Sequence, residues 1–81
     1  SADPYQTAET SIILESVRRG VRCLTDELRE VVMLYYFKEY PVKKIAGIIG
    51  CPAGTVKSRL SRARSELKRI LAKEGIDAAQ T

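Results

Sequence analysis

The stretch VKKIAGIIGCPAGTVKSRLSRAR, residues 42–64, holds two helical patterns separated by a turn. The first pattern spans 42–49, where apolar side chains recur at helical spacing around Ile45. Gly50 can adopt the left-handed conformation that closes a helix, and Pro52 suits the first position of the next one. A helix of two turns, a short turn containing glycine and a long second helix form the outline of a helix-turn-helix.

The rest of the chain also favours helices, because no period-two alternation indicates a strand. Apolar residues recur at steps of three and four over 8–23, and 26–37 holds more of them than one stripe. Thr25 offers a cap oxygen before the second of these segments, and Pro41 breaks the pattern after it. The sequence therefore predicts an all-α, winged-helix-like helix-turn-helix domain without strands, with four helices over 8–23, 26–37, 42–49 and 53–73.

The 81 residues are enough for one small domain with a single core. We expect 1–7 to be a linker or an added remnant, 8–74 the domain and 75–81 a flexible tail, and the chain to be a fragment of a longer protein. The sequence opens with no leader pattern and holds no apolar run long enough to cross a bilayer. We therefore predict a cytoplasmic protein without a membrane partner.

The composition argues against catalysis. The sequence contains no histidine, and no paired carboxylates stand beside a nucleophile, so acid–base and triad chemistries lack their parts. Cys23 and Cys51 have neither a CxxC spacing nor a histidine to complete a metal site. We expect both to be small buried hydrophobes rather than a disulfide. The prediction is a protein that is not an enzyme and that needs no metal or cofactor.

The positive charge of the chain is concentrated in one block. The net charge is +4, but 40–73 carries nine cations and one anion, whereas 1–39 carries five cations and seven anions. This asymmetry indicates a polyanionic partner for the basic block alone.

On the fourth predicted helix, apolar and basic residues fall on opposite sides at about 100° per residue. The arc that must face the core comprises Val56, Leu60, Ala63, Leu67, Ile70 and Leu71. The opposite side combines small residues with long cations, namely Gly54, Lys57, Ser58, Ser61, Arg62, Ser65, Lys68 and Arg69. A merely solvated helix usually mixes charges of both signs, but Glu66 is the single acid of this helix. Because small side chains let a helix enter a groove, and hydroxyls and cations contact bases and phosphates, we interpret this side as a DNA-recognition face.

A longer pattern connects this helix with the residues before it. It comprises Leu24, Arg29, Ile45-Ala46, Gly50 and the whole run GTVKSRLSRAR of 54–64. Over about residues 8–72 the chain resembles region 4 of bacterial sigma factors, specifically the extracytoplasmic-function (ECF) group. The resemblance implies the sigma region 4 type of fold, which binds the minus 35 promoter element in the major groove and docks on the β flap of RNA polymerase to direct transcription initiation. It also implies an anti-sigma factor as a partner, and we expect the isolated domain to be a monomer.

Nine polar residues of the helix-turn-helix are the candidate DNA contacts: Thr55, Lys57, Ser58, Arg59, Ser61, Arg62, Arg64, Lys43 and Lys44. By the resemblance, Lys57, Ser58 and Arg62 would read base edges. Lys43 and Lys44 start the shorter helix, where phosphate contact and plain solvation are both open.

Three of these candidates have a second role open. By the resemblance, Thr55, Arg59 and Arg64 would contact the DNA backbone or brace the helix. Since Arg59 and Arg64 flank the core arc, a salt bridge or a covering role is open for both.

The chain departs from the family pattern in two places. Thr25 follows Leu24 where the family usually has proline, and threonine can cap the helix instead. Pro41 and Lys44 stand where the family usually has a capping residue and a glutamate. That glutamate often steadies the recognition helix through an arginine, so we expect this brace to be absent and Lys44 to be free to reach a phosphate.

Four aromatic residues lie close together at 35–40: Tyr35, Tyr36, Phe37 and Tyr40. We expect them to belong to the core. The alternative is a docking groove for a helix of the polymerase or of an anti-sigma factor.

Two other functions are open on the sequence alone. One is a helix-turn-helix output domain of the response-regulator type, acting as a dimeric activator. The other is a helical protein-interaction module whose basic face meets an acidic partner protein. The long last helix, continuing to Leu71, and the run SRLSRAR favour the sigma-type interpretation. Binding that follows the sequence of a DNA duplex would separate the DNA-binding interpretations from the protein-interaction module.

Overall fold

The computed structural model describes residues 8–76. Its helices follow in the order α1 (Ala8–Cys23), α2 (Asp26–Val32), η1 (Met33–Phe37), α3 (Val42–Ile49) and α4 (Ala53–Lys73). No strand occurs among the described residues, so the all-α prediction is confirmed, with α3 and α4 forming the helix-turn-helix. The predicted linker at 1–7 and the part of the predicted tail at 77–81 lie outside the described residues.

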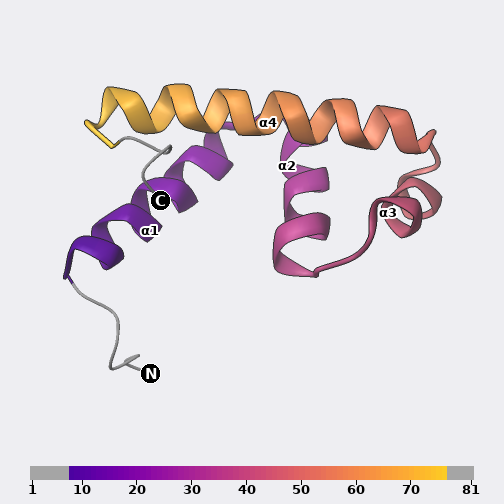
Figure 1. Cartoon of the computed structure of the whole chain (residues 1–81), viewed down its shortest axis with the longest axis horizontal. Coiled ribbons are helices and arrows are strands. Elements are labelled where there is room, and N and C mark those ends of the chain that lie inside the picture. The colour runs from indigo at the N-terminus through magenta and orange to yellow at the C-terminus, as the bar shows by residue number, and fades with distance from the viewer. Residues whose placement is uncertain (1–7, 77–81) are drawn as a thin grey trace.

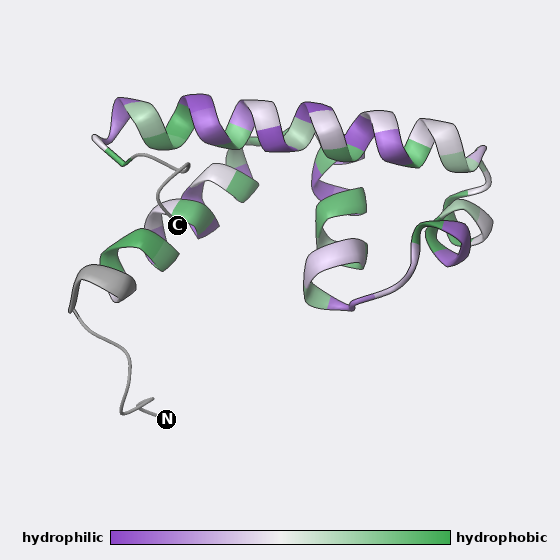
Figure 2. Ribbon diagram, viewed as in Figure 1, coloured by the Kyte–Doolittle hydropathy of each residue, from purple (hydrophilic) through white to green (hydrophobic). Residues whose placement is uncertain are grey.

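The long helix α4 organises the domain. It spans the molecule, and α1, α2 and α3 all lie on one side of it (Figure 1). Hydrophobic and hydrophilic residues alternate in bands along α4 (Figure 2), as an amphipathic helix requires. One side of α4 therefore faces the other helices, and the opposite side is left free for contacts outside the domain.

The core consists of two clusters of buried side chains that meet along α4. The first surrounds Ala63 and comprises Val21, Leu24, Leu28 and Val32 from α1, the turn after it and α2. The second joins Val31 of α2 and Ile45 of α3 to Val56 and Leu60. Since α2 gives residues to both clusters, it lies between α1 and α3 as the central support of α4.

The apolar arc predicted for α4 faces this core. Val56, Leu60, Ala63 and Leu71 are buried, and Leu67 and Ile70 are half-buried. The helical periodicity of the sequence therefore gave the orientation of α4 correctly.

The second predicted helix has the expected span but changes its hydrogen bonding after Val32. Residues 33–37 form a π-helix, and the amide of Lys38 donates to the carbonyl of Met33 at 3.0 Å. Glu39 then adopts a left-handed φ of 57°, and Pro41 is extended with a φ of −68° and a ψ of 154°, which leads the chain into α3. A wider helical turn at this point ends the helix without a long loop.

The aromatic cluster is only partly in the core. Tyr35 and Tyr40 pack against the second cluster, but the side chains of Tyr36 and Phe37 are 48% and 57% exposed. The prediction that the cluster belongs to the core is therefore wrong for these two residues. The physical reason is that α2 and η1 carry more apolar side chains than their contacts with α1, α3 and α4 can cover.

The turn of the helix-turn-helix forms as the sequence predicts. Gly50 has a left-handed φ of 81°, and its amide donates to the carbonyl of Ala46 at 2.8 Å. Pro41 and Pro52 are the N-cap residues of α3 and α4. Pro52 therefore lies one residue before the first helical position for which it was predicted. The carbonyl of each proline accepts the first amide hydrogen bonds of its helix. The turn therefore fixes α4 at a set angle to α3.

The corner between α1 and α2 is closed by polar contacts. The hydroxyl of Thr25 accepts the amide of Leu28 at 3.4 Å, so Thr25 acts as the predicted cap. Arg29 donates to the carbonyl of Leu24 at 2.9 Å, which ties α2 to the end of α1. Because Leu24 occupies the buried position here, Cys23 lies exposed on the outside of the corner.

The prediction of two buried cysteines therefore holds in part. It is wrong for Cys23, whereas Cys51 packs, half-buried, against the second cluster. Both thiols are free.

The far end of α4 is fastened to α1. A Cβ atom on the buried Gly20 would lie 2.9 Å from a methyl carbon of Leu67, so glycine permits the close approach of the two helices. The guanidinium of Arg19 donates both to the buried Ser16 at 3.1 Å and to Glu74 at 3.0 Å. Gly75 and Ile76, which belong to the predicted tail, close α4 with hydrogen bonds to its last turn.

Replacement of Leu60 by alanine should strongly destabilise the domain. The Leu60 side chain is 3% exposed at the centre of the second cluster. A large-to-small change of this kind costs about 2–5 kcal/mol, which is a large share of a small domain's stability. Thermal melts followed by circular dichroism would measure it. The matched control is Leu14→Ala at an exposed position of α1. Equal melting temperatures of the two variants would contradict the orientation of α4.

The hydrogen bonds that the Glu74 carboxylate accepts should make the stability of the folded domain depend on pH. The Ser16 hydroxyl and the Arg19 guanidinium hold the pKa of Glu74 below the ordinary value of 4.5. A carboxylate whose pKa is lower in the folded state than in the unfolded state stabilises the fold at pH values above the unfolded-state pKa. This stabilisation is lost as the pH falls through the folded-state pKa. Glu74→Gln should therefore lower the melting temperature at neutral pH, and its difference from the parent should shrink below about pH 4. A difference that stayed constant in melts down to about pH 3 would refute the contact.

Candidate nucleic-acid interface

The side of α4 that faces away from the core has the composition predicted from the sequence. All eight residues assigned to it are exposed: Gly54, Lys57, Ser58, Ser61, Arg62, Ser65, Lys68 and Arg69. A Cβ atom on Gly54 would meet nothing within 4 Å, so the first turn presents a bare backbone. This surface can approach another molecule closely over the first half of the helix.

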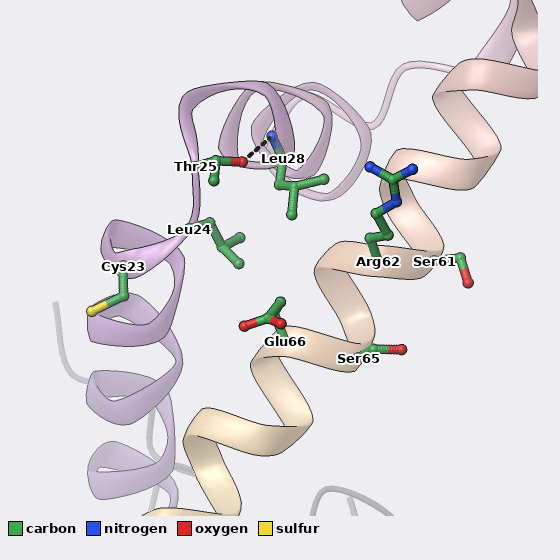
Figure 3. A pocket seen from close by; sticks show the side chains of 8 residues that line it. All are labelled: Cys23, Leu24, Thr25, Leu28, Ser61, Arg62, Ser65 and Glu66. Atoms are coloured by element: carbon green, nitrogen blue, oxygen red, sulfur yellow. Dashed lines mark hydrogen bonds between the residues drawn. The ribbon is translucent and has the colours of Figure 1, made fainter.

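Lys57 and Arg62 are the two cations that this surface carries in the first three turns of α4. Like Lys68 further along, they form no hydrogen bond or ion pair with another described residue, whereas Arg69 is paired with Glu66 at 2.7 Å. Arg62 extends from α4 toward the beginning of α2, with Ser61 and Ser65 on the side turned away from α1 (Figure 3). The free guanidinium and ammonium groups are thus available to an anionic ligand.

Arg59 and Arg64 make the bracing contacts that the sequence left open for them. The side chain of Arg59 is 21% exposed and lies 3.7 Å from a carboxylate oxygen of Glu27. Arg64 donates to the hydroxyl of Tyr36 at 3.0 Å. Each arginine therefore connects α4 to the α2–η1 segment.

The two lysines of α3 differ in their surroundings. Lys43 is exposed at the start of the helix. The ammonium of Lys44 lies 4.2 Å from the centre of the Tyr40 ring, a cation–π contact. Lys44 is thus held on the aromatic ring.

One hollow gathers several of the predicted site residues at the start of α4. It has a volume of about 590 Å³ and is lined by Glu27, Pro52, Gly54, Thr55, Ser58, Arg59 and Arg62. Thr55, Ser58, Arg59 and Arg62 are thus brought together, and Lys57 and Ser61 lie on the same exposed side of α4. Arg64 lies beyond the hollow, and Lys43 and Lys44 lie on α3.

A second, apolar groove lies between α1, η1 and the second half of α4. It has a volume of about 330 Å³ and is lined by Val17, Val21, Val32, Tyr36, Phe37, Arg64, Leu67, Lys68 and Leu71. Its floor is aliphatic, and Arg64 and Lys68 stand at its rim as the two cations. An apolar groove with a basic rim suits an amphipathic helix that carries acidic residues.

The described residues offer little to other kinds of chemistry. They contain no group of three or more histidine, cysteine, aspartate or glutamate side chains that could hold a metal ion. No helix among them is long and apolar enough to cross a membrane. The polar surface of α4 and the apolar groove are therefore the two features to be explained.

Residues 14–67 match the family model described as Sigma-70, region 4. The chain belongs to this family. It is 34% identical to the ECF RNA polymerase sigma factor EcfG of Rhodopseudomonas palustris over 76 residues, which are 94% of this chain and 41% of the relative. It is 37% identical to the ECF RNA polymerase sigma factor SigM of Mycobacterium tuberculosis over 70 residues, 86% of this chain and 34% of that protein. With SigW of Bacillus subtilis it shares 34% identity over 56 residues, 69% of this chain and 30% of the relative.

The match identifies the chain as a region 4 domain similar to those of ECF sigma factors. The chain spans about two fifths of the length of the first of these relatives and less of the other two. Sigma-70 region 4 is a DNA-binding domain of transcription proteins and is not a known enzyme family. This agrees with the basic surface of α4.

The ion pair of Glu27 with Arg59 in this region 4 domain could not be predicted from the sequence. Glu27 lies in the first turn of α2, and its partner Arg59, 32 positions later, leaves no trace in local patterns. Phe37 was expected in the core, with a docking groove as the alternative, and it lines the apolar groove. The one available signal was the surplus of apolar residues over 26–37, which exceeds a single buried stripe.

Proposed function

We propose that this region 4 domain recognises the minus 35 element of a bacterial promoter through the major groove and directs RNA polymerase to it, as the part of an ECF sigma factor that binds DNA in the cytoplasm. The observation that carries the proposal is the exposed side of α4, where Lys57 and Arg62, which pair with no described residue, stand among glycine and serine residues.

The geometry of the helix-turn-helix supports a recognition role for α4. A recognition helix contacts base edges with its N-terminal residues. Here the first three turns of α4 carry the unpaired Lys57 and Arg62, and no other described element covers this side of the helix (Figure 1). The planar fork of an arginine can donate to both acceptors of a guanine, whereas the small serines keep the backbone close to the groove.

The nine candidate residues fall into two groups under this proposal. Lys57, Ser58, Ser61 and Arg62 are free to meet base edges. The remaining residues, which are held by the domain or lie at its edge, would contact phosphates or support the helix: Thr55, Arg59, Arg64, Lys43 and Lys44.

Arg62→Ala should weaken sequence-specific DNA binding and relax the preference at one or two base pairs. The expected loss is about 1–3 kcal/mol, the discrimination of a bidentate arginine–guanine contact. The measurement is fluorescence anisotropy with duplexes selected from a random pool by the parent chain. Lys73→Ala is the matched control, because Lys73 is an exposed cation about 16 Å further along α4. If both variants lost affinity equally for all duplexes, α4 would be a non-specific basic surface and the proposal would fail.

We also propose the apolar groove as the surface that docks on the β flap of RNA polymerase. Tyr36 and Phe37 are large apolar side chains kept at the surface, and they line a groove whose rim carries Arg64 and Lys68. The groove lies along the second half of α4, so its occupant would leave the first half free for DNA. An anti-sigma factor that covered the same groove would compete with the polymerase.

Phe37→Ala should reduce binding to a bacterial core RNA polymerase by about tenfold, as expected for an aromatic anchor in a groove. DNA binding by the same variant should be unchanged, since Phe37 does not lie on the exposed side of α4. Ile48→Ala is the matched control, because Ile48 is similarly exposed on α3 but does not line the groove. Equal polymerase affinities of the two variants, measured by biolayer interferometry, would place the docking surface elsewhere.

A further inference from the structure

The ion pair between Glu27 and Arg59 has an unusual place in the domain. It joins the first turn of α2 to the second turn of α4 at 3.7 Å. Among the nine candidate DNA contacts, Arg59 is the one that pairs with a carboxylate of a described residue. The pair therefore lies inside the proposed DNA interface rather than on an unrelated surface.

The two partners differ in how firmly they are held. The Arg59 side chain is 21% exposed and lies against the domain, whereas the Glu27 side chain is 71% exposed. Glu27 lines the hollow at the start of α4 together with Thr55, Ser58 and Arg62. A carboxylate in this position faces the same space as the residues proposed to meet DNA.

A carboxylate at this site has two physical consequences for a polyanion. It repels phosphates that approach the hollow, and it occupies a guanidinium that would otherwise neutralise one of them. Both effects oppose binding that depends on the DNA backbone alone, which any duplex offers equally. A complex whose position on the DNA is already fixed by base contacts depends less on a phosphate contact of Arg59.

We infer that Glu27 is a positioning residue that holds Arg59 away from the phosphates and thereby lowers non-specific DNA binding. The inference rests on the proposed function and adds to it a residue of α2, outside the helix-turn-helix, that sets the specificity of α4. Glu27 also takes the place of the bracing glutamate for which this chain has Lys44. The carboxylate that steadies an arginine of the recognition helix comes here from α2.

The test compares Glu27→Gln with Glu30→Gln in the full 81-residue chain. Both changes remove one negative charge from α2, but Glu30 is exposed and forms no ion pair with a described residue. Binding to a random-sequence duplex and to a duplex selected by the parent is titrated at several salt concentrations. Thermal melts of each variant report whether the fold is intact.

For Glu27→Gln we expect the affinity for the random duplex to rise about twofold to fivefold, the range that an exposed ion pair is worth. The slope of log K against log salt should become steeper by about 0.9, because Arg59 now neutralises one more phosphate. Affinity for the selected duplex should change by less than about twofold, so the ratio of specific to non-specific binding falls. In an Arg59→Gln background, Glu27→Gln should no longer alter the slope.

Three results would overturn the inference. The first is that Glu27→Gln and Glu30→Gln behave alike, since the effect would then be net charge only. The second is an unchanged slope, and the third is a loss of affinity confined to the selected duplex, which would make Glu27 a direct base contact. A parent chain that preferred no duplex would instead refute the proposed function itself, so the two failures are distinguishable.

Discussion

The packing of α4 against α2 is the contact on which the rest of this domain depends. Ala63 faces the first cluster and Leu60 the second, so a single helix closes both halves of the core. Because α2 supplies Leu28 and Val32 to one cluster and Val31 to the other, neither half can form without it. Burial of these few side chains fixes the rotation of α4 about its own axis, and with it the direction in which every cation of that helix points.

The local patterns of the sequence were sufficient where one residue decides one conformation. Gly50 in the turn, Thr25 at the cap and the helical spacing of Val56 and Leu60 each have a short-range physical cause, and the structure confirms them. The sequence failed where the outcome depends on the area that other elements can cover. Phe37 is as apolar as a core residue, but no element among residues 8–76 covers it.

Electrostatic partners across the fold show the same limit of prediction. The free side of α4 could be predicted, because it follows from the helical repeat alone. The pairing of Arg59 with Glu27 and of Arg64 with Tyr36 could not, since each joins residues about 30 positions apart through the tertiary fold. What these contacts decide is which cations of the basic block are free and which are held by the domain.

The arrangement along α4 gives the domain two surfaces that need not compete. The first half of the helix, from the turn at Gly50 onward, carries Lys57 and Arg62 on its exposed side, and the second half forms one wall of the apolar groove. Arg64 stands between them, bonded to Tyr36 at the rim of the groove. A protein helix in the groove would therefore meet a rigid α4 whose rotation is already fixed by the core. Under the proposed function, docking on the polymerase would orient the recognition helix without any change in the fold of the domain.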